Sequence, residues 1–138
     1  MVDPLEVVIA WLGQDADLAN LVGTRIAAKH RYGVSWTAGL AGLAVRLDGG
    51  LPDLYAAVQE IRLDVRCYAS TQQLAVQVWR RLVELSRDRE RVPVLAASGS
   101  GLLYRFLQAS GPSLLYDTEL KMDFVLCFFN ALVSEDAL

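Results

Sequence analysis

Hydrophobic and polar residues alternate most strictly over residues 58–68. The apolar set Ile61, Leu63, Val65 and Cys67 alternates with the second set Arg62, Asp64, Arg66 and Tyr68. A period of two residues is typical of a β-strand that buries one face and leaves the other polar. We therefore expect a strand over 58–68, with the first set in a core and the second set on a polar face.

Apolar residues at helical spacing predict three helical segments. The first begins at Asp3-Pro4, which supplies a cap and a proline for the first turn, and ends at Gly13. The second is short and runs from Asp15 to Gly23. The third begins at Ser70 or Thr71 and continues to about Ser86, with an apolar stripe wide enough to pack on a sheet.

The remaining apolar segments predict short strands separated by turns. We expect strands over 25–30, 40–48, 94–97, 102–108 and 114–129, with a loop over 31–39. The far end of the last strand is apolar on both faces, which predicts a central place in the sheet or a cover. Residues 132–138 are expected to form a frayed tail.

This order of elements predicts the fold class. We expect an α+β fold in which one mostly antiparallel sheet has helices packed on one face. The whole chain, 1–138, is expected to be a single small domain, because 138 residues are enough for one core and no linker interrupts the pattern.

Composition then limits the class of protein. With 54% hydrophobic and 21% charged residues, the chain is neither disordered nor collagen-like. Its net charge of -3 argues against a strongly basic nucleic-acid binder. The longest apolar run, 124–129, is far shorter than the roughly 20 residues that span a bilayer. No basic stretch precedes the first apolar residues, so no secretory signal is expected.

Known catalytic patterns are missing from the sequence. His30 is the single histidine, so neither a zinc site nor a carboxylate–histidine pair is expected from it. Cys67 and Cys127 lie in apolar stretches, which favours two buried thiols, with a disulfide as the alternative. Arginines over 80–91 alternate with acidic residues, as at a solvated helix end. We therefore predict no catalytic, metal-binding or cofactor-binding residue and no cofactor.

An interface is the more specific expectation. The candidate contact residues are Tyr32, Trp36, Arg62, Asp64, Arg66 and Tyr68. Aromatic residues and arginine are enriched at interface hot spots, and a large aromatic in the glycine-rich loop 31–39 has little core of its own to fill. The alternative for Arg62, Asp64 and Arg66 is that they face water and pair across strands.

Three segments together resemble the tail terminator, or tail completion, proteins of long-tailed bacteriophages and phage-like particles. They are DPLEVVIAWL at 3–12 leading to DLANLVGTRI at 17–26, LDVRCYAST at 63–71 running into the following helix, and LLYD at 114–117 leading into the last strand. Each is a weak motif, and the resemblance lies in their order over most of the chain. The sequence GLAVR at 42–46 departs from the family, whose members often have a proline before the second strand.

The resemblance implies a structural, non-enzymatic role. Such proteins form a homo-oligomeric ring, usually a hexamer, at the head-proximal end of the tail tube, where they stop tube growth and meet head-completion proteins. The implied partners are further copies of the chain, the tail tube protein and a head-completion or connector protein. Neither a membrane nor specific nucleic-acid binding is implied, although DNA passes through such a ring. The implied location is the virion tail at the head–tail junction, and the host cytoplasm during assembly.

Two other functions remain as alternatives. One is another head–tail connector component, such as a head-completion or adaptor protein. The other is a small ligand-binding or enzymatic α+β domain, which would need a pocket with converging polar groups.

Overall fold

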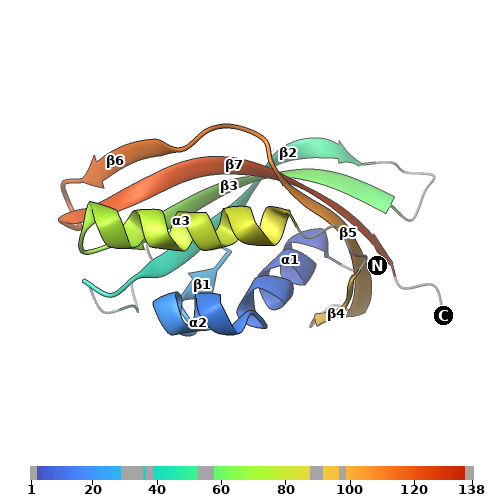
Figure 1. Cartoon of the computed structure of the whole chain (residues 1–138). Helices are drawn as coiled ribbons and strands as arrows, with labels where there is room; N and C mark the ends of the chain where they lie inside the picture. Colours follow the sequence, from blue (N-terminus) through green and yellow to red (C-terminus); the bar gives the residue numbers. More distant parts are fainter. Residues whose placement is uncertain are drawn as a thin grey trace.

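The structure, a computed structural model, describes residues 3–28, 36, 39–52, 58–87, 92–96 and 99–135 (Figure 1). The described helices are α1 (Pro4–Gly13), α2 (Ala16–Val22) and α3 (Gln72–Ser86). The described strands are β1 (Ile26–Ala27), β2 (Gly42–Pro52), β3 (Val58–Ala69), β4 (Val92–Ala96), β5 (Gly99–Gln108), β6 (Ser113–Asp117) and β7 (Met122–Glu135).

The described strands form one sheet in the order β1-β2-β3-β7-β5-β4. All pairs in it are antiparallel except β1 with β2. Strand β6 pairs with the first half of β7, while β5 pairs with the second half. Strand β7 is therefore central, as its two apolar faces predicted. It continues to Glu135, so residues 132–135 belong to the sheet and not to a frayed tail.

The expected architecture, an α+β fold with helices packed on one face of the sheet, is wrong. Strands make up 50% of the structure and helices 29%. The sheet curls into a half-barrel (Figure 1). Two β-bulges help to explain the curl, one in β2 between Leu47 and Gly50 and one in β5 between Leu103 and Arg105. A bulge bends its strand and increases the local twist, and a sequence pattern of period two does not reveal it.

The helices begin at the residues that the sequence indicated. The side chains of Asp3, Asp15 and Thr71 accept hydrogen bonds from backbone N–H groups in the first turns of α1, α2 and α3. Such caps satisfy donors that a helix leaves without a partner. Helix α2 ends at Gly23, whose φ of 59° lies in the region that favours glycine.

The main core lies between α3, α1 and the apolar side chains of β3, β7 and β5. Leu63, Val65 and Cys67 are fully buried there, as predicted. The ring of Phe106 stacks on Phe129 with 4.6 Å between centroids, and Trp11 meets its edge at 5.3 Å. Contacts of this kind fix how α1 lies against β5.

A second, smaller cluster lies on the opposite face of β3 and β7. It consists of Ala44, Tyr68, Met122 and Phe124, with Trp36, Leu120 and Leu126 partly buried against it. Both faces of the sheet are therefore buried at this end of β7.

Cys67 and Cys127 are buried free thiols, as the sequence favoured. Cys127 is paired with Val65 and Cys67 with Val125, so the two cysteines are diagonal neighbours on one face. Burial raises the pKa of both thiols, and for Cys67 the nearby Cys127 adds to the increase.

We expect both thiols to resist modification in the folded protein, because the reactive form is the thiolate. Dithionitrobenzoate at pH 8 should therefore label neither cysteine quickly in buffer and both in denaturant. The absorbance of the released thiol measures this directly. Rapid labelling of the folded protein would contradict the burial of these side chains.

Candidate interaction surface on the outer face of the sheet

Four of the predicted contact residues, Arg62, Asp64, Arg66 and Tyr68, share the face of β3 that points away from α3. The strand register places Asp64 opposite Arg46 of β2 and opposite Phe128 of β7. Arg66 lies opposite Leu126 in the same way. The predicted alternation thus continues onto both neighbouring strands.

A ladder of alternating charges crosses β2 and β3. Oδ1 of Asp64 accepts a hydrogen bond from Nε of Arg66 at 3.4 Å. Oδ2 of Asp64 lies 3.5 Å from Nη2 of Arg46. Asp48 lies 3.8 Å from the same Arg46 nitrogen and 3.6 Å from Arg62 Nε. We call Arg46, Asp48, Arg62, Asp64 and Arg66 the arginine face. It holds three guanidinium groups and two carboxylates, so its formal charge is positive although the chain is acidic.

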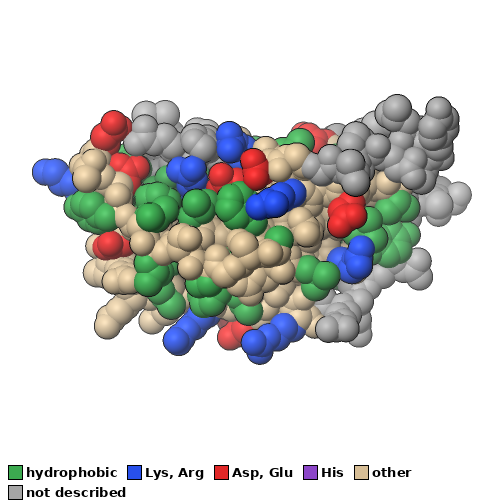
Figure 2. All heavy atoms as spheres, turned by 90° about the horizontal axis from the view of Figure 1, so that it is seen from above, with side chains coloured by type: hydrophobic (Ala, Val, Ile, Leu, Met, Phe, Trp, Pro, Cys, Tyr) green, Lys and Arg blue, Asp and Glu red, His purple; other side chains and the backbone are tan. Residues whose placement is uncertain are grey.

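Aromatic rings of β7 lie beneath two of these arginines. The guanidinium carbon of Arg62 is 4.5 Å from the centroid of Phe128, and that of Arg66 is 5.6 Å from Phe124. Both distances are within the range of cation–π attraction. Figure 2 shows basic, acidic and hydrophobic side chains intermixed over this side of the molecule. The arginines are thus held over apolar surface and carry planar groups that can donate several hydrogen bonds.

Exposure divides the arginine face into an inner and an outer part. The side chain of Asp64 is 6% exposed and that of Arg66 is 18% exposed, whereas Arg62 is 49% exposed. The alternation predicted a polar face along the whole strand. The exposed fractions show instead that part of this face is buried. Asp64 and Arg66 are therefore largely covered by the folded sheet, whereas the side chains of Arg46, Asp48 and Arg62 are 44%, 37% and 49% exposed and accessible to a partner.

Tyr68 and Trp36 differ from the sequence-based expectation. Tyr68 is fully buried and stacks on Phe124 with 4.9 Å between centroids. Trp36 is half-buried and packs against the same cluster. The argument that Trp36 has no core of its own to fill is therefore wrong, since the outer face of the sheet has a small core at this end. Tyr32, like His30, lies outside the described residues.

Four residues of this surface are not among the contacts predicted from the sequence: Arg46, Asp48, Phe124 and Phe128. A signal for Arg46 was present, because it alternates with apolar residues in the strand expected over 40–48. Pairing that strand antiparallel to the strand at 58–68 brings opposite charges into contact. The two phenylalanines could be assigned to this face only once β7 was known to lie beside β3.

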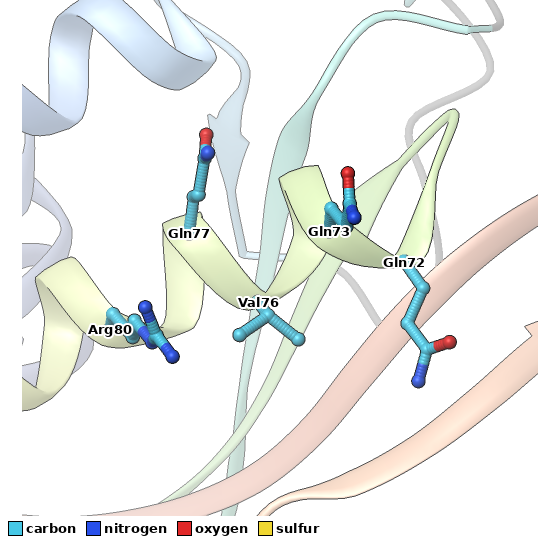
Figure 3. Close-up of a pocket in the computed structure, with 5 residues that line it drawn as sticks. All are labelled: Gln72, Gln73, Val76, Gln77 and Arg80. Carbon is cyan, nitrogen blue, oxygen red and sulfur yellow. The ribbon is translucent and has the colours of Figure 1, made fainter.

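Helix α3 carries a surface hollow with a volume of about 340 Å³ (Figure 3). Its described lining residues are Gln72, Gln73, Val76, Gln77 and Arg80. Figure 3 shows Gln73 and Gln77 on one side of the helix and Val76 on the other. These polar groups do not converge on a point, so the hollow lacks the convergence typical of a ligand site.

The described residues add two negative findings. They contain no group of three His, Cys, Asp or Glu side chains placed to hold a metal ion. None of the described helices is long and apolar enough to span a membrane.

No protein-family model matches the sequence, and no curated protein matches it.

Proposed function

We propose that this chain is a structural virion protein that forms a ring, most simply a hexamer, at the head-proximal end of a phage tail tube. The ring ends tube polymerisation and provides the surface that joins head-completion proteins. The role is not enzymatic and uses no cofactor. Its partners are its own copies, the tail tube protein and a head-completion protein, and its location is the head–tail junction of the virion.

The order of three segments along the chain carries this proposal. They correspond to α1 with α2, to β3 leading into α3, and to β6 leading into β7. Their resemblance to tail terminator proteins covers most of the chain. The proposal therefore rests on the arrangement of the whole domain, because the sequence has no catalytic motif from which to argue.

The arginine face supports an assembly role. Subunits of a ring meet head to tail, so each needs two different contact surfaces. Arg62 has an exposed guanidinium that lies over the ring of Phe128, and Arg46 adds a second exposed guanidinium. Exposed charges of this kind suit the rim of an interface, where they select and orient a neighbouring subunit. We assign the outer part of the arginine face to one of the two contacts in the ring.

Growth of the tail tube in the presence of this protein tests the function. A tail tube protein, sought in the gene next to that of this chain, is allowed to polymerise alone and with an equimolar amount of this chain. Tube lengths are measured by electron microscopy. The proposal predicts shorter tubes with a narrow length distribution. Unchanged tubes, together with binding to a portal or adaptor protein, would indicate the alternative connector role.

Reversal of one exposed charge tests the proposed contact. Arg62→Glu should weaken assembly, because it places a carboxylate beside Asp48 and removes the guanidinium that lies over Phe128. We expect at least a tenfold higher protein concentration to be needed to stop tube growth, roughly 1.4 kcal/mol. Arg87→Glu, at an exposed residue just after α3, is the matched control. Equal activity of both variants would remove the arginine face from the interface.

A further inference from the structure

Strand β6 is an edge strand with exposed apolar side chains. Leu114, Leu115 and Tyr116 are 52%, 44% and 55% exposed. On one side β6 pairs with β7, and no described strand lies on its other side. Leu115 lies opposite Phe124 on one face of the sheet, and Leu114 lies opposite Val125 on the other. Both faces of this edge are therefore apolar and open to solvent.

The free edges of β2, β5 and β4 carry features that discourage pairing. Strand β2 has a bulge and the charged residues Arg46 and Asp48. Strand β5 extends past the residues that pair with β4, and this unpaired part begins at a bulge beside Arg105. Strand β4 contains Pro93, which has no N–H to donate. Bulges, charges and prolines are the devices by which proteins protect sheet edges. Strand β6 has neither a bulge nor a proline, and its one charged residue, Asp117, lies at its last position.

The sequence of β6 is complementary to itself in antiparallel pairing. With Leu115 at the centre, the two copies of Leu115 face each other, and Leu114 of each copy meets Tyr116 of the other. Ser113 then meets Asp117 of the other copy, so no two like charges are opposed. Aliphatic and aromatic pairs in this position stabilise adjacent strands. A partner strand would also cover both apolar faces at once.

We propose that β6 is the contact through which two copies of this chain pair edge to edge, with Leu115 on the two-fold axis. Antiparallel pairing would join the two sheets into one continuous sheet. A two-fold contact is complete after two copies, so it does not by itself build the proposed ring. The pairing needs no tail tube, and its test is independent of the proposed function.

The turn after β6 keeps the strand in place for such pairing. Asp117 Oδ1 accepts hydrogen bonds from the N–H groups of Glu119 at 3.0 Å and Leu120 at 3.1 Å. Lys121 then adopts a φ of 55° where the chain enters β7. Bonds of this type fix a tight turn, so β6 is held beside β7 before any partner arrives.

Disulfide cross-linking tests the register directly. Residues opposite each other in antiparallel strands have Cα atoms roughly 5 Å apart, within disulfide range, whereas diagonal neighbours are about 7–8 Å apart. Under mild oxidation Leu115→Cys should give a covalent dimer, and Leu114→Cys should cross-link at least about tenfold more slowly, because its two copies are diagonal. The wild-type protein, whose thiols are buried, is the baseline.

Sedimentation measures the unmodified contact. A five-residue edge is small, so we expect a reversible monomer–dimer equilibrium with a dissociation constant of about 10–100 µM. Leu115→Lys and Leu115→Glu should each be monomeric, since each opposes like charges, and their mixture should form dimers again. A monomeric wild-type protein at about 1 mM, or equal cross-linking of Leu114→Cys and Leu115→Cys, would overturn the proposal.

Discussion

Arg66→Glu is expected to lower the free energy of unfolding by about 2–4 kcal/mol. The substitution removes a cation that donates to Asp64 at 3.4 Å and places a second carboxylate beside it. Asp64 is only 6% exposed, so water cannot compensate for the lost partner, and Arg46 at 3.5 Å remains as its single described cation. Breaking a buried pair costs more than the pair contributes, because a charge stays behind without a partner.

Arg62→Glu is the matched control for this effect. Arg62 lies on the same strand and the same face, but its side chain is 49% exposed and its nearest described carboxylate is 3.6 Å away. Exposed pairs of this kind contribute about 0–1 kcal/mol. Urea unfolding followed by circular dichroism compares the two variants. Equal destabilisation by both would contradict the division of the arginine face into an inner and an outer part.

This comparison also changes how the interface must be tested. Because Arg62 and Arg66 share one face of β3, reversing both together is the obvious variant for testing that face. The burial of Arg66 and Asp64 makes the double variant ambiguous, because it would also disturb the sheet. Arg62 is therefore the residue that separates assembly from folding.

Asp15→Ala should destabilise the protein by about 2–3 kcal/mol, because Asp15 performs two roles. One carboxylate oxygen caps α2 by accepting from the N–H of Leu18 at 2.8 Å. The carboxylate also accepts two hydrogen bonds from Arg81 of α3, at 2.8 Å from Nε and 2.6 Å from Nη2. This bidentate pair joins the start of α2 to α3 through two residues that are 66 positions apart in the sequence.

Two control variants separate these roles. Asp15→Asn keeps a good capping residue but loses the charge, so it should recover about 1 kcal/mol of the loss. Asp17→Ala removes a carboxylate that is 3.6 Å from Arg81 but 71% exposed, and it should cost less than about 0.5 kcal/mol. Urea unfolding at pH 7 measures all three variants. A cost for Asp17→Ala as large as that for Asp15→Ala would contradict the assignment.

Acid should abolish the contribution of the Asp15 charge. The hydrogen bonds from Arg81 hold the pKa of Asp15 below its ordinary value of 3.8. A carboxyl group with a lowered pKa in the folded state stabilises the fold above the unfolded-state value, and this stability is lost as the pH falls through the folded value. Wild type and Asp15→Asn should therefore differ in unfolding free energy at pH 6, and the difference should shrink as the pH falls below 3.8 and through the lower folded-state pKa. A gap that persists at low pH would mean that the charge is not its cause.

The local elements were predictable because local chemistry determines them. Asp3, Asp15 and Thr71 begin helices through their own side chains, and the alternation in β3 needs only its own residues. The curl of the sheet was not predictable, since it depends on bulges that appear only when two strands are paired. The fold class was misassigned for that reason.

The candidate surface was predictable only in part. Arg62, Asp64 and Arg66 were placed on one face correctly, but their burial depends on which side chains the neighbouring strands bring beside them. Arg81 was assigned to a solvated helix end, whereas it is 24% exposed and bonded to Asp15. A contact between residues 66 positions apart leaves no periodic signal in the sequence.

Electron microscopy of tube ends tests whether this chain forms a terminating ring. Tubes grown from the neighbouring tube protein are mixed with an excess of purified protein, and images of both ends are averaged separately. We expect an added ring with six-fold symmetry at one end only, and we expect Arg62→Glu to abolish it. Bare ends at a saturating concentration of the folded wild-type protein would contradict the proposed function.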